Sequence, residues 1–330
     1  MSFRALVTDR TGDGAIVSAV ETLEDDRLPD GSVTVDIDFA GLNYKDALCL
    51  TGGGALVRAY PHVAGIDFAG TVRQSDDGRY AVGDAVVLTG WRVGETHWGG
   101  FAERARVDAD WLVKLPPGLS TRDAMIVGTA GLTAMLAIDR LEGAGLKPGG
   151  EVLVTGASGG VGSIAISLLA KLGYRPVALT GRPGHGEALK ALGAAEIIAR
   201  DAFFAQPDKP LESARWAAAI DAVGGRVLGK LLRQVGYGGA VASIGNAGGI
   251  GFESNVLPFI LRGISLIGID SVMQPYETRI AAWRRLAENF DIAGYGALVE
   301  EVGLEALPQA AGRILAGQVH GRIIVPVKRG

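Results

Sequence analysis

The sequence predicts an α/β protein of two domains, in which a doubly wound parallel-sheet domain is inserted into a mostly β domain. Its 330 residues exceed the roughly 250–300 that a single hydrophobic core usually serves. Near Pro116-Pro117-Gly118 the chain also changes from short strands and turns to alternating strands and helices. We therefore predict that residues 1–120 and 272–330 form the mostly β domain and that residues 121–271 form the inserted domain.

The composition is that of a compact, acidic protein. Hydrophobic residues make up 48% of the chain and charged residues 21%, which is typical of a globular fold. A net charge of −4 argues against a nucleic-acid partner, which usually requires a basic face. The single cysteine, Cys49, excludes an intrachain disulfide and a cysteine-rich zinc lobe. Residues 1–7 lack the features of a signal peptide, so we expect a cytoplasmic protein without a membrane partner.

The first part of the chain carries strand patterns. Residues 32–39 alternate with a period of two, and residues 84–88 form a further strand pattern after a glycine. Ser120 and Asp123 then predict the start of a helix that runs toward Leu141. We expect this helix to break near residues 128–131, where two glycines lie close together, and to lead into the second domain.

Strands and helices alternate regularly through the second part of the chain. Such alternation predicts a parallel, doubly wound sheet with helices on both faces. The predicted strands are residues 151–155, 176–179, 196–199, 217–221, 239–244 and 265–269, and the predicted helices are residues 163–173, 187–192 and 227–235. The rhythm then ends, and we expect the tail to return to the first domain. This tail contains predicted helices at residues 276–290 and 304–316 and a predicted strand at residues 322–327.

A glycine-rich turn joins the first strand of this alternation to its helix. The turn reads Gly156-Ala157-Ser158-Gly159-Gly160-Val161-Gly162. A strand, a glycine turn and a helix in this order direct backbone amides and a helix dipole at a pyrophosphate, as in Rossmann domains. We predict nucleotide contacts from Ser158, Gly159, Gly160 and Val161. The alternative is that the glycines serve only the packing of the helix on the strand.

The end of the second strand indicates which nucleotide binds. An acidic residue at this position would bind the adenosine ribose of NAD, but the chain has Thr180, Gly181 and Arg182 here. A hydroxyl and a guanidinium can both bind a 2′-phosphate, which a carboxylate would repel. The sequence therefore favours NADPH. Arg200, after the third strand, is either a second cation for this phosphate or a solvated loop residue.

Several further segments resemble the medium-chain dehydrogenases/reductases, specifically the branch of acrylyl-CoA reductases and quinone-oxidoreductase-like proteins. The resemblance covers essentially the whole chain, and the segments are specific together. They are Leu42-Asn43-Tyr44-Lys45-Asp46-Ala47-Leu48, Gly65-Ile66-Asp67-Phe68-Ala69-Gly70, Leu88-Thr89-Gly90-Trp91 with His97-Trp98-Gly99-Gly100, Gly128-Thr129-Ala130-Gly131 and Asp270-Ser271-Val272-Met273. The resemblance implies a GroES-like mostly β catalytic domain with an inserted Rossmann domain.

The same resemblance predicts that the protein has no metal site. Zinc-dependent members of the superfamily have a cysteine at the position that matches Tyr44. Zinc requires three or four nitrogen, sulfur or oxygen ligands in tetrahedral reach, and the histidines of this chain are scattered without such spacing. Asp67 lies where those enzymes have a glutamate, and we interpret it as a structural hydrogen-bonding residue.

Without a Lewis acid, reduction of an activated C=C bond is a better fit than carbonyl chemistry. Such a reduction needs a proton at the α-carbon. The resemblance makes Tyr44 a candidate donor, since enoyl-thioester reductases of this superfamily use a tyrosine in a similar segment. Its alternative role is packing or contact with the nicotinamide. Asn43 and Asp46 could orient Tyr44 or the nicotinamide ribose. The resemblance also implies cofactor contacts at Tyr44, Asn246, Ile260, Ser271 and Arg322.

The resemblance suggests acrylyl-CoA, which is reduced to propionyl-CoA, as the substrate. Four arginines could bind the phosphates of a CoA thioester or be ordinary surface residues, namely Arg58, Arg92, Arg104 and Arg106. Trp91 and Trp98 could line a pocket or pack in the core. A quinone or enone reductase is the enzymatic alternative, and a non-catalytic NADPH-binding protein is the alternative of another class. The family also suggests a homodimer, with residues 265–272 as a candidate edge strand.

Overall fold

The computed structural model describes residues 1–328, and the chain divides into two compact units. Unit 1 contains residues 1–129, 271–287 and 296–330, and unit 2 contains residues 130–270 and 288–295. Most of the tail belongs to unit 1, and residues 288–295 belong to unit 2. The first boundary falls after Thr129 instead of the predicted 120, because the first turns of helix α2 (Thr121–Gly143) pack with unit 1.

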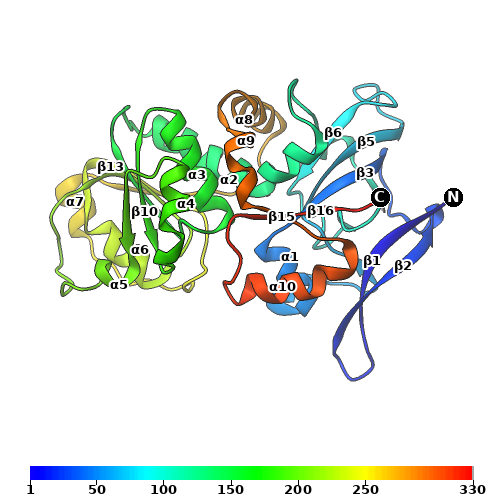
Figure 1. Cartoon of the computed structure of the whole chain (residues 1–330), viewed down its shortest axis with the longest axis horizontal. Helices are drawn as coiled ribbons and strands as arrows, with labels where there is room; N and C mark the ends of the chain where they lie inside the picture. The colour runs from blue at the N-terminus through cyan, green and yellow to red at the C-terminus, as the bar shows by residue number, and fades with distance from the viewer. Residues whose placement is uncertain (329–330) are drawn as a thin grey trace. The chain divides into compact units, whose positions relative to one another are not determined.

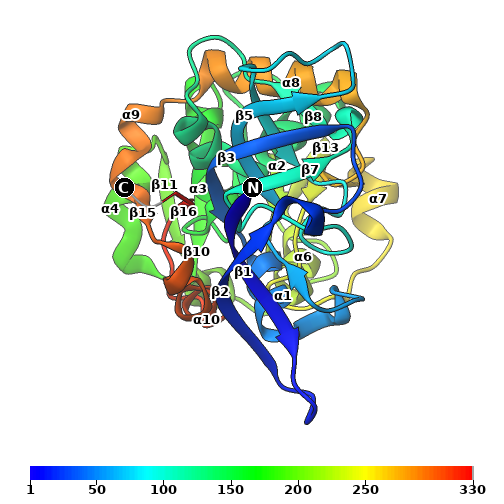
Figure 2. The ribbon, with the colours of Figure 1, turned by 90° about the vertical axis from the view of Figure 1, so that its right-hand side faces the viewer.

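Unit 1 is mostly β, as the strand patterns predicted. Its core is formed by the inward side chains of two sheets, including Val33, Val35 and Phe68. One sheet has the order β2-β1-β4, and in the other β15-β16-β3-β5-β6-β8 are joined by β7, which pairs with β3 (Figure 2). The strands are β1 (Ser2–Arg10), β2 (Ile16–Glu24), β3 (Val33–Leu42), β4 (His62–Val63), β5 (Asp67–Ser75), β6 (Ala85–Thr89), β7 (Arg104–Val107), β8 (Leu112–Lys114), β15 (Val299–Glu301) and β16 (Arg322–Pro326).

Three helices belong wholly or mainly to unit 1. They are α1 (Tyr44–Thr51), α8 (Tyr276–Asn289) and α10 (Leu307–Leu315). The predicted helix at residues 304–316 is a 3₁₀ turn followed by α10, since Pro308 opens the regular helix. Strand β16 pairs antiparallel with β3, which joins the C-terminal segment to a strand near the other end of the chain (Figure 1).

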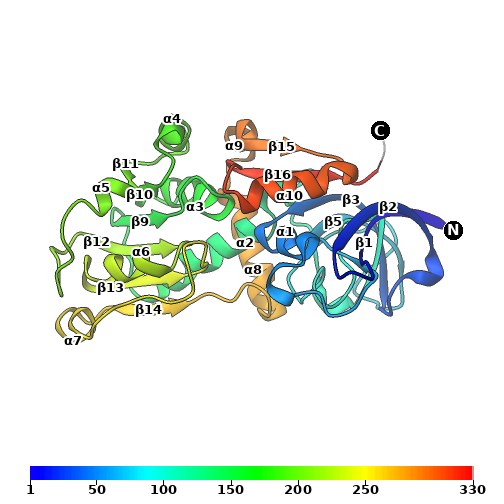
Figure 3. The same cartoon turned by 90° about the horizontal axis from the view of Figure 1, so that it is seen from below.

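Unit 2 is a six-stranded parallel sheet in the doubly wound order β11-β10-β9-β12-β13-β14 (Figure 3). Its core includes Leu153, Val177, Trp216 and Val241. The strands are β9 (Glu151–Thr155), β10 (Arg175–Thr180), β11 (Glu196–Ala199), β12 (Trp216–Asp221), β13 (Val235–Ser243) and β14 (Ser265–Gly268). The helices are α3 (Gly160–Lys171), α4 (Gly186–Ala191), α5 (Arg200–Phe203), α6 (Gly225–Leu232), α7 (Leu257–Arg262) and α9 (Ile292–Tyr295). The predicted edge strand at residues 265–272 is β14.

Helix α2 is broken at Gly128, inside the predicted region. This residue has φ +50° and ψ −155°, a conformation that L side chains rarely adopt. The helix is long and apolar enough to cross a membrane, but 83% of its most apolar window is buried within the protein. It is therefore a core helix that connects the two units.

Candidate nucleotide-binding and active site

The glycine-rich turn of unit 2 has the geometry of an anion site. Helix α3 begins at Gly160, and its N-cap residue Gly159 has no side chain to satisfy the first amides. A Cβ on Gly162 would lie 2.5 Å from the carbonyl oxygen of Gly156, so only glycine lets the helix approach the turn. The free amides and the helix dipole suit a pyrophosphate. The helix starts earlier than the predicted residue 163 because the second half of the turn is itself helical.

Side chains at the end of β10 are linked to this turn. The hydroxyls of Ser158 and Thr180 lie 3.2 Å apart, and the backbone N–H of Arg182 donates to Thr180 Oγ1 at 3.0 Å. Burial lowers the pKa of the Arg182 guanidinium, whose charge is thus partly desolvated. A Cβ on Gly181 would lie 3.2 Å from Arg200 Cζ, so this glycine makes room for a second guanidinium. The predicted phosphate-binding residues therefore lie together.

A buried pair at the carboxyl end of the sheet was missed by the sequence reasoning. Thr155 Oγ1 donates to Asp221 Oδ1 at 2.6 Å, and the N–H of Gly224 donates to Asp221 Oδ2 at 2.9 Å. The N–H of Ala222 donates to Thr155 Oγ1 at 3.1 Å. Burial raises the pKa of Asp221. This pair fixes the turn after β12 beside the glycine turn, and the signal was an acidic residue at a strand's carboxyl end.

The remaining predicted cofactor residues occupy different places. Asn246 follows β13 at the carboxyl end of the sheet, and a Cβ on Gly224 would lie 3.4 Å from its Cα. Ile260 lies on α7 and is 68% exposed. Ser271 belongs to unit 1, where its carbonyl oxygen accepts from Arg279 Nη2 at 3.2 Å. Within unit 2, therefore, Asn246 lies beside Gly224 of the turn after β12, and Ile260 lies on a separate helix.

Tyr44 lies at the first position of α1 in unit 1. Asn43 caps this helix in an extended conformation, and its N–H donates to Asp46 Oδ2 at 2.8 Å in a capping box. Tyr44 is 48% exposed, and among residues 1–328 its hydroxyl makes no hydrogen bond. The capping geometry thus presents a phenol that is free to contact a ligand.

Asp46, by contrast, is fully buried beneath the start of α1. Its Oδ1 accepts from the N–H of Ile66 at 2.7 Å, and its Oδ2 accepts from the Asn43 N–H. Burial, and then the neighbouring charge of Asp67, raise the pKa of Asp46 to about 7. Asp46 therefore contacts backbone amides and Asn43, and it supports the turn that carries Tyr44.

Asp67 is the structural hydrogen-bonding residue that the sequence predicted. Its Oδ1 accepts from the N–H of Gly41 and from Asn43 Nδ2, both at 3.1 Å, and its Oδ2 accepts from the N–H of Thr129 at 2.7 Å. Both oxygens are thus used within unit 1. Across the described part of the chain, no three His, Cys, Asp or Glu side chains are grouped so as to hold a metal ion.

The four candidate arginines differ in their partners. Arg104 forms ion pairs with Asp25 and Asp36 and is not available to a ligand. Arg106 Nε donates to Thr34 Oγ1 at 3.3 Å. The other two candidates are exposed, namely Arg58 and Arg92.

Trp91 and Trp98 are half-buried and pack against the core of unit 1. Trp91 also lies in a strained turn that the sequence did not reveal, since Trp91 and Arg92 have φ of 55° and 59°. The buried Arg279 stabilises this turn: its Nη1 donates to the carbonyl oxygen of Thr89 at 2.6 Å, and its Cζ lies 5.0 Å from the Trp91 ring centroid.

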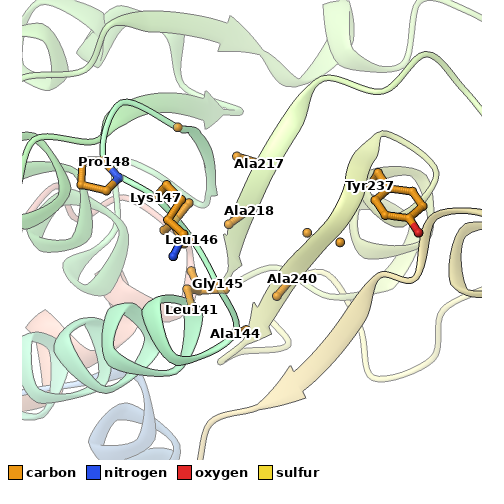
Figure 4. Close-up of a pocket in the computed structure, with 13 residues that line it drawn as sticks. Leu141, Ala144, Gly145, Leu146, Lys147, Pro148, Ala217, Ala218, Tyr237 and Ala240 are labelled. Carbon is orange, nitrogen blue, oxygen red and sulfur yellow. The ribbon is translucent and has the colours of Figure 1, made fainter.

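A pocket of about 250 Å³ lies in unit 2 at the ends of the strands opposite to the glycine turn. Gly150 directly precedes β9, and Ala217 and Ala218 lie at the start of β12, so the pocket is at the amino ends of these strands. Figure 4 shows its small side chains, with Lys147 and Tyr237 on different sides. Nucleotides bind at the carboxyl ends of such strands, so this pocket is not the nucleotide site.

Known proteins match this chain over nearly its whole length. The family described as alcohol dehydrogenase GroES-like domain matches residues 29–117, and the family described as zinc-binding dehydrogenase matches residues 160–288. The chain is 54% identical to acrylyl-CoA reductase AcuI of Ruegeria pomeroyi, over 98% of this chain and 99% of that protein. It is 45% identical to the putative quinone oxidoreductase YhfP of Bacillus subtilis, over 98% of both chains.

Solved structures of similar proteins contain nicotinamide nucleotides. The YhdH oxidoreductase of Salmonella enterica, in complex with NADP, matches with a TM-score of 0.95 and 51% identity, over 99% of this chain and all of that one. The Bacillus subtilis protein YhfP, with NAD bound, matches with a TM-score of 0.95 and 44% identity, over 99% of this chain and all of that one. These proteins share the GroES-like and Rossmann architecture of this chain.

Proposed function

Because the chain belongs to the acrylyl-CoA reductase and quinone-oxidoreductase-like branch of the medium-chain dehydrogenases/reductases, we propose that it reduces the C=C bond of acrylyl-CoA to give propionyl-CoA. The observation that carries this proposal is the 54% identity to an acrylyl-CoA reductase over 98% of the chain. The exposed Tyr44 phenol agrees with it, since this reaction requires a proton donor.

NADPH is the proposed cofactor, and the residues of unit 2 fit it. The α3 amides at Gly160 and Val161 suit the pyrophosphate, because no N-cap side chain occupies them. Thr180, Arg182 and Arg200 offer a hydroxyl and two cations to the 2′-phosphate. A similar protein has been solved with NADP and another with NAD, and we infer that these side chains favour NADPH in this chain.

In the proposed reaction, bound NADPH supplies a hydride that forms a C–H bond at the β-carbon of the thioester. The electron pair of the C=C bond moves to the α-carbon and the thioester carbonyl, and Tyr44 donates its phenolic proton to the α-carbon. Because Tyr44 is half exposed, solvent can return the proton to it. Asn43 and Asp46 hold the turn that carries Tyr44 and act through it.

Steady-state kinetics with NADPH test this proposal against its alternatives. We expect a larger kcat/KM for acrylyl-CoA than for a simple quinone. The opposite order would favour a quinone reductase, which the 45% identity to the putative quinone oxidoreductase YhfP makes the second candidate. Tight NADPH binding without turnover of any activated alkene or quinone would favour a non-catalytic NADPH-binding protein.

The proposed assembly is a homodimer formed through unit 2. Strand β14 is the last strand of the six-stranded sheet, and its outer edge is unpaired among residues 1–328. Val256, Ile260 and Leu261 expose large apolar side chains on the adjacent α7 segment. These features support pairing of two sheets into one. Light scattering should give twice the chain mass, and Leu261→Asp should lower it, whereas a wild-type monomer at micromolar concentration contradicts the proposal.

A cytoplasmic location is proposed on the burial of α2, the single helix of residues 1–328 that is apolar and long enough for a membrane. Cell fractionation should recover the protein in the soluble fraction. Recovery with membranes after a high-salt wash would contradict this location.

A further inference from the structure

We propose that Arg322 is a positioning residue that sets the orientation of Tyr44 by holding Asn43 against the break in helix α2. The inference rests on the proposed function, in which Tyr44 donates a proton. It differs from the cofactor contact that the family resemblance suggested for Arg322.

The Arg322 guanidinium is turned into the interior of unit 1. Its side chain is 3% exposed at the start of β16. Nη1 donates to Asn43 Oδ1 at 2.8 Å, Nε donates to the carbonyl oxygen of Ile126 at 3.1 Å, and Nη2 donates to that of Met125 at 3.3 Å. Nη2 also lies 3.9 Å from Asp67 Oδ2. All three nitrogens therefore have partners inside the unit.

Arg322 and Asp67 together satisfy the broken ends of α2. Arg322 binds carbonyl groups in the last turn before Gly128, where a cation is favoured, and Asp67 accepts from the N–H of Thr129, where an anion is favoured. A Cβ on Gly128 would lie 2.6 Å from Arg322 Nη2 and 2.8 Å from Asp67 Oδ2. The Arg322–Asp67 ion pair therefore packs tightly against Gly128 at the break in α2, which holds both side chains in place.

Asn43 is the link from this pair to Tyr44. Asn43 Nδ2 donates to Asp46 Oδ2 and to Asp67 Oδ1, both at 3.1 Å, while its Oδ1 accepts from Arg322. Both polar atoms of the amide are therefore bonded to ionisable side chains. Because Asn43 is the N-cap of α1 and Tyr44 is its first residue, fixing Asn43 fixes the direction in which the phenol leaves the helix.

Arg322→Lys separates this proposal from direct cofactor contact. A lysine keeps the charge, but one ammonium cannot make the same set of planar contacts. We expect kcat to fall at least about tenfold, with the KM for NADPH changing less than about threefold, as for loss of an interaction that acts in the transition state. A rise in the KM for NADPH with unchanged kcat would show cofactor contact and overturn the proposal. Arg313→Lys, at the surface pair with Glu300, is the matched control and should change neither constant.

A double-mutant cycle tests whether Arg322 acts through Tyr44. In a Tyr44→Phe background, Arg322→Lys should lower kcat by less than about twofold, because residues that act as one unit are not additive. A full additional loss in that background would contradict action through Tyr44. If Arg322→Lys does not fold, Asn43→Ala removes the same link and should give the same pattern.

Hydrogen exchange tests, without any substrate, whether Arg322 holds the turn at Asn43. Arg322→Lys should speed amide exchange at least about tenfold in residues 43–47, and Arg313→Lys should leave these residues unchanged. Unchanged amide exchange in Arg322→Lys would overturn the proposal that Arg322 holds this turn. A wild-type protein that does not reduce acrylyl-CoA would instead contradict the proposed function, while the exchange result would still decide whether Arg322 holds this turn.

Discussion

Replacing Asp46 with asparagine should change the pH dependence of the stability of unit 1. Burial and Asp67 raise the pKa of Asp46 from 3.8 to about 7 in the folded protein. Between these values the folded state holds a proton that the unfolded state has released, so stability falls as the pH rises through this window. A shift of about three units corresponds to as much as about 4 kcal/mol between pH 4 and pH 7. Because an asparagine side chain cannot ionise, the Asp46→Asn variant should lack this loss.

Urea unfolding followed by tryptophan fluorescence can measure the difference. Four tryptophans lie in unit 1 and Trp216 lies in unit 2, so a Trp216→Phe background makes the signal specific for unit 1. The amide that Asp46→Asn introduces will face an N–H donor, and the variant should therefore carry a constant cost of about 1–3 kcal/mol at every pH. As the pH rises from 4 to 7, the free energy of unfolding of the wild type should fall to that of Asp46→Asn or below it. A difference that stays constant over this range would refute the reasoning.

Three further changes test the cofactor and metal assignments. Gly162→Ala places a Cβ 2.5 Å from the Gly156 carbonyl oxygen, a backbone atom that cannot turn away. Calorimetry should therefore show that the affinity for NADPH falls at least about tenfold. Unchanged affinity would contradict a nucleotide site at this turn. Arg182→Ala should weaken NADPH by about 10- to 100-fold, as expected for loss of a charge-assisted hydrogen bond, and NADH by less than about threefold. Equal losses would mean that Arg182 does not bind the 2′-phosphate. Dialysis against a chelator should leave kcat unchanged, whereas a loss that zinc restores would contradict metal-independent catalysis.

The features that the sequence predicted correctly depend on local patterns. Strands β9 and β11 have the predicted bounds, because each is a short apolar run between turn signals. The glycine turn between β9 and α3 was recognisable because a strand precedes it and a helix follows it. The same local logic placed the break of α2 near Gly128.

The side-chain network around Tyr44 could not be predicted in this way. Arg322 and Asn43 are 279 positions apart in the chain, and Arg279 and Thr89 are 190 apart, so no periodicity relates them. Tertiary packing alone decides that Asp46 is buried at a depth that shifts its pKa while its neighbour Tyr44 is exposed. The motif located the segment that carries these residues, but it could not show that Tyr44 is exposed while Asn43 and Asp46 hold its turn in place.

The most direct test of the proposed activity follows the hydride itself. The protein should be incubated with acrylyl-CoA and with NADPH that carries deuterium at both positions of C4, and the thioester product analysed by mass spectrometry and NMR. We expect propionyl-CoA with one deuterium, located at the β-carbon. Unreduced acrylyl-CoA, or propionyl-CoA with its deuterium at the α-carbon, would contradict the proposed reaction.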